Sequence, residues 1–428
     1  MARYGSVLPI RCHRRNWLRL ASAAGTVSLL SCVTPPKAPP PPPPAPVHGF
    51  ELSAIGFDQL EGWAGADPEK ALEAFRRSCT QLLDKAADAP LGGAGYAGTV
   101  ADWEPPCRQA ASVQPSTPDG IRAFFEAAFV PYRISEGHND GLFTGYYEPE
   151  LKGSRTQHGP YQTPLYGVPP DLVHLDMGIY RDTLIGRMAA QGMMMGMVMR
   201  FVPYPARAEI EQEGVPATPL FYVDDSVDAF FLQIQGSGRV VLDDGTVVRA
   251  AYAGQNGQPY TAIGAILLAR GELTREEISA QSIRAWLLAH PEEAREVMDA
   301  NASYVFFAER PVGDPTLGAT GAEGVPLTPA ASLAVDRAVH PLGVPVWLEG
   351  SAPDLDPVNP DRRWDALLVA QDTGGAIKGV VRADVYWGYG ADAGSIAGRM
   401  KHPGRMNVLL PRRLAAKLGR QAQFASPR

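Results

Sequence analysis

The sequence predicts a mainly β protein with a few helices, and three observations support that fold class. Short apolar runs separated by glycine and proline follow one another closely after residue 307. Apolar residues at helical spacing are confined to a few segments of the 428-residue chain. Hydrophobic residues make up 45% of the chain, which is enough for an ordinary globular core. Many short strands joined by frequent turns indicate a β-barrel or sandwich rather than a doubly wound sheet.

The first 31 residues have the pattern of an export signal. Arginines at positions 11, 14, 15 and 19 precede an apolar run over residues 18–30, which is too short for a membrane-spanning helix. Cys32 directly follows Leu-Leu-Ser, which is similar to the lipobox of bacterial lipoproteins. We therefore expect residues 1–31 to be a lipoprotein signal peptide and Cys32 to be lipidated. The alternative is an ordinary cleaved signal with an incidental cysteine.

Residues 32–48 are expected to form the lipid anchor and a proline-rich spacer. Residues 35–46 are all proline except for one lysine and two alanines. Such a tract adopts extended polyproline II at about 3.1 Å per residue, which gives a reach on the order of 45 Å. The spacer would lift the folded body away from a membrane.

Helices are expected where capping residues precede apolar residues at helical spacing. An N-cap residue followed by proline begins a helix at position 67 and another at position 117. Thr274 and Glu277 match a capping box at the start of a third helix. Pro291 begins a short helix that ends near residue 301, and another short helix is expected over residues 392–400.

Strands are expected where short apolar runs lie between turn residues. The turn Asp243-Asp244-Gly245 indicates a hairpin between residues 240–242 and 246–248. The composition changes near Glu150 and returns to strand and loop after Phe307. The other expected strands are residues 141–147, 221–223, 229–235, 331–335, 344–348, 366–369, 377–381 and 406–410.

Two cysteines remain once the leader and Cys32 are set aside. Cys79 and Cys107 would then lie in an exported, oxidising environment, where a disulfide between them is the expected pairing. Two buried free thiols are the alternative, because sequence alone does not show that the two Cα atoms are close enough.

The charge and the histidine pattern argue against two classes of function. The formal net charge is −7, and subtracting the five positive charges of the leader arginines leaves −12 for the remainder. Such an acidic body is a poor candidate for binding nucleic acid through its phosphates. The eight histidines show no H-x-x-H or H-E-x-x-H pattern, so we expect neither a metal nor a cofactor.

Residues 371–379 and 382–388 are the strongest candidates for chemistry. They place Asp372 and Asp384 among four glycines and several aromatic residues. Glycine allows tight turns and close backbone approach, and ionisable groups held in such settings often have shifted pKa values. Asp336 also follows a strand-like run, so the three carboxyl groups could project from neighbouring strand ends. The alternative is a turn region whose aspartates only accept hydrogen bonds from backbone N–H groups.

Eight strings occur in order along residues 140–410. They are GLFTGYYEP at 141–149, RAEI at 207–210, QIQGSG at 233–238, YAGQNG at 252–257, NASYVFF at 301–307, DR at 336–337, QDTGGAIKG at 371–379 and RAD at 382–384. Together they resemble the membrane-bound lytic murein transglycosylase A family, whose C-terminal part is named for three aspartates. The resemblance does not extend to the spacer or to residues 48–130.

The resemblance implies a specific fold. It implies a double-psi β-barrel domain with N-terminal helices, over residues 49–149 and 308–428, whose three-aspartate region covers about 325–412. A smaller inserted β-barrel domain would occupy residues 150–307. A groove between the two domains would hold a glycan strand.

The resemblance also implies an activity. Asp384 matches the catalytic acid of a family that cleaves the β-1,4 bond between N-acetylmuramic acid and N-acetylglucosamine without water and leaves a 1,6-anhydro end. One carboxyl group suffices for this reaction, because the attacking C6 hydroxyl belongs to the substrate itself. Asp372 would orient Asp384 or stabilise oxocarbenium charge, while Asp336 is either a third catalytic carboxylate or structural.

Several residues are candidates for contacts with sugars, and each has the alternative of an ordinary core or surface role. Lys378 is a candidate partner for a lactyl or peptide carboxylate. Aromatic rings near Asp384 would also desolvate it and raise its pKa. The other candidates are Thr144, Tyr146, Tyr147, Gln233, Gln235, Ser237, Tyr386 and Trp387.

The expected partners are peptidoglycan glycan strands, the outer membrane through the lipid anchor, and cell-wall enzyme complexes. The expected location is the periplasmic face of the outer membrane. Two other functions are kept as alternatives. One is a hydrolase that uses two carboxylates, and the other is a non-catalytic lipoprotein that tethers peptidoglycan.

Overall fold

The computed structural model describes residues 50–114, 117–137, 140–176, 187–195 and 198–425. The predicted signal peptide, the lipidation site Cys32 and the proline-rich spacer lie outside these residues. Within them, no helix has both the length and the apolar character needed to cross a bilayer.

Six strands close into a barrel. Their order around it is β17, β14, β15, β13, β16 and β3, and β3 pairs again with β17 to complete the ring. β3 with β16 and β13 with β15 are parallel pairs, whereas the other pairs are antiparallel. This closed ring confirms the mainly β, barrel-containing fold class. The bounds are β3 Gly141–Glu148, β13 Ser332–Val335, β14 Pro345–Ala352, β15 Arg362–Asp372, β16 Arg382–Tyr389 and β17 Lys401–Pro411.

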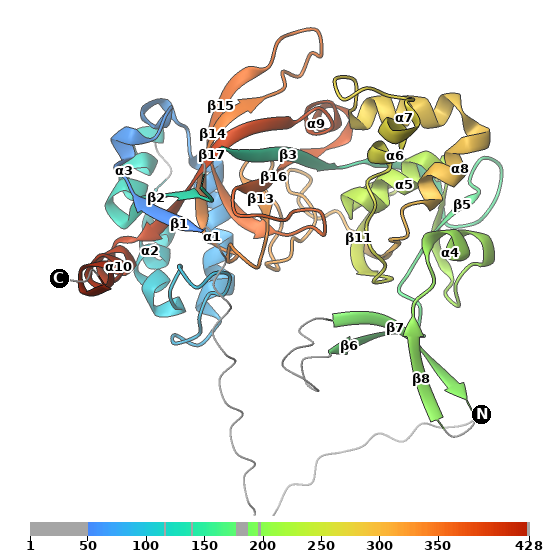
Figure 1. The fold of residues 1–428 in the computed structure, drawn as a ribbon, viewed down its shortest axis with the longest axis horizontal. Helices are drawn as coiled ribbons and strands as arrows, with labels where there is room; N and C mark the ends of the chain where they lie inside the picture. The colour runs from blue at the N-terminus through green and yellow to red at the C-terminus, as the bar shows by residue number, and fades with distance from the viewer. Residues whose placement is uncertain (1–49, 115–116, 138–139, 177–186, 196–197, 426–428) are drawn as a thin grey trace, which may run out of the picture. The chain divides into compact units, whose positions relative to one another are not determined.

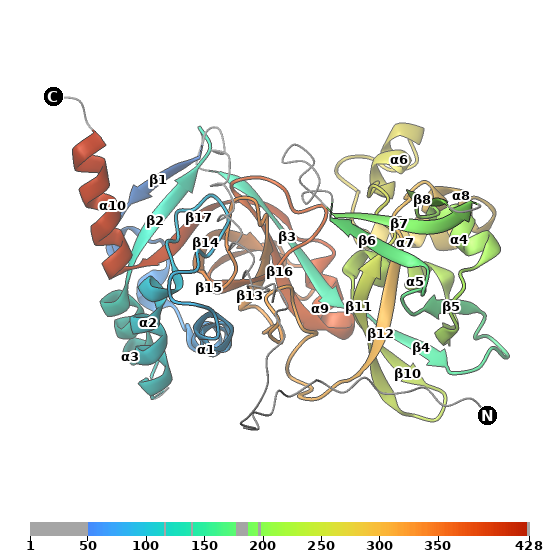
Figure 2. The same cartoon turned by 90° about the horizontal axis from the view of Figure 1, so that it is seen from below.

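N-terminal helices cover the outside of this barrel. α1 Glu69–Leu83 packs on β15, and α2 Val100–Ser112 and α3 Pro118–Ala128 lie beside it (Figure 1). Phe75, Trp103 and Trp347 belong to one continuous apolar core between these helices and the barrel. β1 Glu51–Ala54 and β2 Phe129–Ser135 extend the sheet from β17, and α10 Arg412–Ala425 packs beside β2 and β17 (Figure 2).

A second sheet of six strands is inserted between β3 and β13. Its order is β12, β11, β10, β4, β9 and β5, and an isolated bridge from Gly167 to Phe307 joins its two edges. The insertion agrees with the smaller second barrel that the resemblance implied. The bounds are β4 Glu150–Ser154, β5 Thr163–Tyr166, β9 Pro219–Val223, β10 Gly238–Leu242, β11 Val247–Gln255 and β12 Val305–Pro311.

The remaining elements are short and surround these two sheets. β6 Leu172–Asp176, β7 Arg187–Met195 and β8 Val198–Pro203 form a separate three-stranded sheet. The helices are α4 Arg207–Glu213, α5 Ser226–Gln235, α6 Ile263–Arg270, α7 Ala280–Ala289, α8 Pro291–Asp299 and α9 Gly390–Ala397, with single 3-10 turns at Phe57–Gln59 and Trp63–Gly65.

Two predicted strands are wrong. Residues 229–235 belong to α5, because the Asp225 side chain caps the helix by accepting from the backbone N–H groups of Val227 and Asp228. Residues 377–381 form a loop and not a strand, since the backbone of Gly379 has a φ of +121° and its N–H binds the side chain of Asp336.

One helix prediction also needs correction, and one helix was not predicted. Thr274 and Glu277 do exchange capping hydrogen bonds, but they do so within a turn, and the helix itself begins at Ala280 after the cap Ser279. α2 was not expected, because Pro105 and Pro106 lie inside it and proline normally interrupts a helix.

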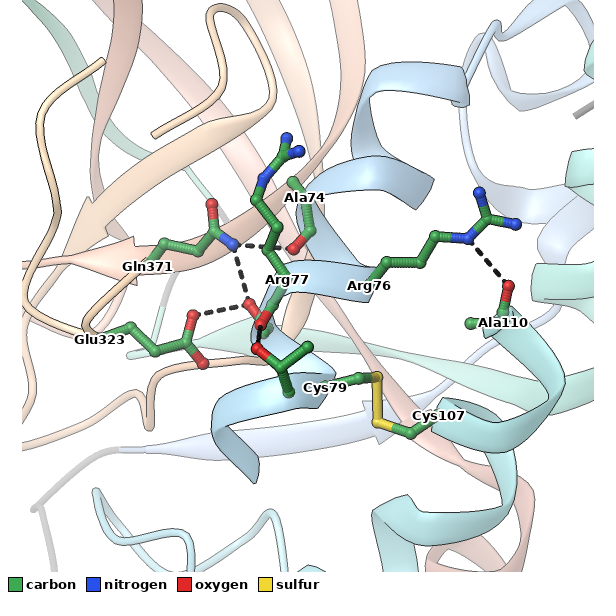
Figure 3. The surroundings of a disulfide bond; sticks show 10 residues. Ala74, Arg76, Arg77, Cys79, Cys107, Ala110, Glu323 and Gln371 are labelled. Carbon is green, nitrogen blue, oxygen red and sulfur yellow. Dashed lines mark hydrogen bonds between the residues drawn. A yellow bond between two sulfur atoms is a disulfide. The ribbon is translucent and has the colours of Figure 1, made fainter. Parts of the chain in front are cut away.

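The predicted disulfide is present. Cys79 of α1 and Cys107 of α2 are bonded, with their Cα atoms 5.4 Å apart (Figure 3). Both residues are buried in the main core. The bond therefore fastens α2 to the helix that packs directly on β15.

Replacing both cysteines by serine is expected to lower the free energy of unfolding by about 2–4 kcal/mol, because the unfolded chain loses a cross-link. Chemical denaturation under oxidising conditions measures this difference. A reducing agent should bring the wild-type chain to the value of the double variant and leave the double variant unchanged. Equal stability of the two oxidised chains would contradict the expectation.

Candidate active site

A cavity of about 680 Å³ lies where barrel residues meet residues of the inserted part. Its base is formed by side chains of β3, β15 and β16, and Asp372 and Asp384 are both among them. The inserted part contributes residues of α5 and β11. Other lining residues include Thr144, Tyr146, Gln233, Gln235, Ser237, Tyr252, Tyr260, Ala322, Arg382 and Tyr386.

Asp384 is held by a chain of polar contacts on the floor of the cavity. Parallel pairing of β16 with β3 sets Asp384 beside Thr144. The Thr144 hydroxyl donates to Asp384 Oδ1, and Arg382 Nη2 donates to Thr144 Oγ1 over 2.8 Å. Because Thr144 already accepts from a cation, its own proton is directed toward Asp384.

Asp372 ends β15 and accepts several donors. Its Oδ1 accepts from the backbone N–H of Ala322 over 2.9 Å, and its Oδ2 accepts from the Tyr146 hydroxyl over 2.9 Å. Burial and the neighbouring Asp372 raise the pKa of Tyr146 well above its ordinary value, so the phenol stays a donor.

The two carboxyl groups have different environments. Burial raises the pKa of both, and the nearby charge of Asp372 raises that of Asp384 further, while Thr144 and Arg382 act in the opposite direction. Asp372 receives hydrogen bonds from two backbone N–H groups and one phenol, which favour its charged form. We therefore assign the proton of the pair to Asp384 and the charge to Asp372.

Asp336 has a different setting. It follows β13 and is buried, and it accepts from the N–H groups of Ala338 and Gly379 over 3.1 and 3.0 Å. Burial acts to raise the pKa of Asp336, but those N–H groups and the Lys378 ammonium together hold it below the ordinary value. Lys378 Nζ lies 3.4 Å from Asp336 Oδ1 on a mostly exposed side chain. This pair fastens the loop after Asp372 instead of lining the cavity, which favours the structural alternative for both residues.

Most of the predicted sugar contacts line the cavity, but several of their polar atoms are already engaged. Gln233 accepts from Arg207 over 2.8 Å. Gln235 and Ser237 accept from the backbone N–H groups of Tyr147 and Tyr252, over 3.1 and 3.0 Å. These residues therefore shape the wall, and only their remaining polar atoms are available to a ligand.

The aromatic predictions divide by strand face, because successive side chains of a strand point to opposite sides. Tyr146 and Tyr386 share the cavity face, with ring centroids 5.3 Å apart. Trp387 lies on the other face of β16, 5.1 Å from the ring of Trp364. The ring of Tyr147 likewise lies against Gly394 of α9, and only its backbone faces Gln235.

Sequence reasoning assigned no role to three residues of the cavity. Tyr252 and Tyr260 are large aromatic side chains that are 52% and 43% exposed, which is unusual for residues inside a cavity wall. Arg382 lies two residues before Asp384 in one strand and hence on the same face. That spacing could have identified Arg382, whereas the position of Tyr260 depends on the tertiary fold.

A closed barrel whose cavity holds two half-buried carboxyl groups in unequal environments is a candidate site for carboxyl acid–base chemistry. The description "MltA specific insert domain" matches residues 142–308, and "3D domain" matches residues 331–410. The "Membrane-bound lytic murein transglycosylase A" of Escherichia coli strain K12 is 34% identical over 278 residues, which are 64% of this chain and 67% of that protein. The chain belongs to the membrane-bound lytic murein transglycosylase A family.

Solved structures show the same relationship. A membrane-bound lytic murein transglycosylase from Agrobacterium tumefaciens superposes with a TM-score of 0.74 at 33% identity, over 86% of this chain and 99% of that one. Escherichia coli MltA with bound chitohexaose superposes with a TM-score of 0.62 at 27% identity, over 85% and 95% of the two chains.

The pKa of Asp336 is lowered in the fold and that of Asp384 is raised, so we expect replacement of each by asparagine to change the stability in opposite directions. Asp336→Asn should lower the free energy of unfolding at pH 7 by about 1–3 kcal/mol, because an amide cannot replace the carboxylate that accepts backbone N–H groups. The pKa of Asp336 is depressed in the fold, so this loss should fade as pH falls.

Asp384→Asn should instead raise the free energy of unfolding at pH 7. The pKa of Asp384 is raised in the fold, so its contribution to stability is present at low pH and lost as pH increases through the raised value. Denaturation curves between acidic and neutral pH compare the two variants. A loss of stability in both at neutral pH would contradict the assignment.

Proposed function

We propose that this chain is a lytic transglycosylase that cleaves the β-1,4 bond between N-acetylmuramic acid and N-acetylglucosamine in peptidoglycan. The reaction uses no water and leaves a 1,6-anhydro end. The observation that carries the proposal is Asp384, a carboxyl group with a raised pKa that is held by Thr144 at the base of the cavity. Family membership supports it, as does the relative whose structure holds chitohexaose.

Asp384 acts first as an acid and then as a base. Its proton passes to the glycosidic oxygen as the bond from that oxygen to the anomeric carbon breaks. The C6 hydroxyl of the same muramic acid then attacks the anomeric carbon, and Asp384 takes the hydroxyl proton. The carboxyl group is thereby restored, and no second base is needed because the nucleophile is already part of the substrate.

The surrounding residues have supporting roles in this proposal. Arg382 and Thr144 fix the orientation of Asp384 through two successive hydrogen bonds. The charged Asp372, held by Tyr146, stabilises positive charge that develops on the sugar ring. A single group thus transfers both protons, while its neighbour remains ionised.

The exposed rings of the cavity offer the sugar contacts. Tyr252 and Tyr260 expose large aromatic faces, and such faces pack against apolar faces of sugar rings. Burial, and to a smaller extent Asp384, raise the pKa of Tyr260, and both residues line the same cavity. The free amide atoms of Gln233 and Gln235 are suited to an N-acetyl group.

The proposed location follows from the N-terminal pattern. A signal peptide over residues 1–31, a lipid on Cys32 and a stiff spacer would hold the catalytic part on the periplasmic face of the outer membrane. The names of the relatives also include the words "membrane-bound". Peptidoglycan strands are then the partner within reach, and cell-wall enzyme complexes are further candidates.

Digestion of purified peptidoglycan is expected to release muropeptides with 1,6-anhydro ends, lighter by one water than hydrolysis products. Asp384→Asn should lower this activity by about 10³-fold or more, because one group supplies both proton transfers. Mass spectrometry of the products, with circular dichroism to confirm folding of the variant, tests both statements.

The same digest separates the alternatives. Products with ordinary reducing ends would overturn the proposal in favour of a hydrolase that uses Asp384 with Asp372 or Asp336. Binding to peptidoglycan with no product released would favour a non-catalytic tether.

Thr144→Val removes the hydroxyl but keeps the side-chain shape, and Thr144→Ser keeps the hydroxyl. We expect the valine variant to lose about tenfold in kcat, since a hydrogen bond to a charged group contributes roughly 1.5 kcal/mol or more. The alkaline limb of the pH–rate profile of the valine variant should move to higher pH. The Thr144 hydrogen bond favours the charged form of Asp384, so its loss raises the pKa of Asp384. Steady-state rates across pH measure both effects, and equal behaviour of the two variants would refute the role of the hydroxyl.

A further inference from the structure

Residues 319–327 form a loop that supplies a backbone contact to the carboxyl pair. Ala322 donates its N–H to Asp372 Oδ1 over 2.9 Å, and Glu323 donates its N–H to the carbonyl of Gln371 over 3.0 Å. Two successive residues of the loop thus attach to the last two residues of β15. The loop also closes on itself, because Gly321 N–H binds Val325 O and Leu327 N–H binds Ala319 O.

The side chain of Glu323 points toward α1 (Figure 3), and Glu323 is not among the residues that line the cavity. Ser78 Oγ donates to Glu323 Oε2 over 2.6 Å. The other oxygen, Oε1, is buried and makes no hydrogen bond with the described residues. A Cβ atom built on Gly343 would lie 2.8 Å from this oxygen and 3.0 Å from a Leu82 methyl group, so the space beside Oε1 has no room for a side chain at position 343.

Gln371 completes the connection between α1 and the carboxyl pair. It is fully buried, and its Nε2 donates to Ala74 O and to Ser78 Oγ, each over 2.8 Å (Figure 3). Ser78 therefore accepts from Gln371 and donates to Glu323. One hydroxyl of α1, next to the disulfide residue Cys79, holds both the strand that ends in Asp372 and the loop that caps it.

We propose that Glu323 is a positioning residue for Asp372, which in its neutral form holds residues 319–327 against Ser78 and keeps the Ala322 N–H on the Asp372 carboxylate. This inference rests on the proposed function, because Asp372 is the charged partner of the acid Asp384. Glu323 itself touches neither the substrate nor Asp384 in this assignment. Ionisation would spread a negative charge over both carboxylate oxygens, of which Oε1 meets no donor among the described residues. Residues 319–327 would then move away from Ser78.

Burial favours the neutral form of Glu323, and the surrounding polar and charged groups oppose it only partly. Burial raises the pKa of Glu323 to about 7, against smaller opposing effects of Ser78, Lys85 and Gln371. The Arg77 guanidinium of α1 donates instead to Thr328. Asp372 is the acid that the loop contacts, through the backbone N–H of Ala322. The neutral form of Glu323 is therefore stable below about pH 7 and is lost as pH rises through that value.

The test compares kcat of Glu323→Gln with that of the wild-type chain from about pH 5.5 to pH 8. Glutamine has the same shape and stays neutral, and the ratio of the two rates cancels the titration of Asp384. We expect a ratio near one at low pH that increases to on the order of tenfold at pH 8, where a group with a pKa near 7 is about nine-tenths ionised. KM should not change. Glu276→Gln, at an exposed position of the inserted part, is the matched control and should give a flat ratio.

Hydrogen exchange of the Ala322 amide provides a readout that does not need activity. At pH 8 the wild-type amide should exchange faster than that of Glu323→Gln, and the two should agree near pH 5.5. If the glutamine variant does not fold, Lys85→Gln serves instead, and the transition should then move to higher pH because a positive charge that favours ionised Glu323 is gone. A flat rate ratio together with equal exchange at pH 8 would overturn the positioning role. Altered exchange in a chain that releases no anhydro product would overturn the proposed function alone.

Discussion

The parallel pairing of β3 with β16 is the interaction on which the site depends. It joins residues separated by the whole insertion, and its register sets Thr144 against Asp384 and Tyr146 against Tyr386. In the proposed site, the hydroxyl that orients the acid comes from one strand and the acid from the other. β3 pairs with β17 on its other edge, so closure of the barrel fixes the position of Thr144.

The chemistry then follows from unequal environments of identical side chains. Asp336, Asp372 and Asp384 all lie at or near strand ends, yet only the first has a pKa below its ordinary value. Backbone N–H groups and an ammonium keep the charge on Asp336, which makes it an anchor for the following loop. Burial and the charge of the neighbouring Asp372 raise the pKa of Asp384, against the effects of Thr144 and Arg382, so it is the group that we propose as the acid.

The sequence predicted most strands as short apolar runs between turn residues, and the helices that begin near positions 67 and 117, and it failed where local patterns were ambiguous. Residues 229–235 contain apolar residues at both spacings, and the caps Asp225 and Gly236 decide for a helix. Alternation along β3 could have separated Tyr146 from Tyr147, since only one of them shares a face with Thr144. No sequence pattern could have shown the loop contact to Asp372, because it is made by the backbone of Ala322, and a backbone donor has no side-chain signature.

The disulfide connects this site to the proposed location of the protein. Cys79 follows Ser78 in α1, and Ser78 supports both Gln371 and Glu323, so the bond to α2 fixes the helix that carries this support. Such a bond forms in an oxidising compartment and is rare in a reducing one. Export through the N-terminal leader would therefore place the chain where its cavity meets the proposed substrate and where the disulfide that supports α1 can form. In this proposal the N-terminal leader determines where the protein is located, and α1 supports the geometry of the catalytic site.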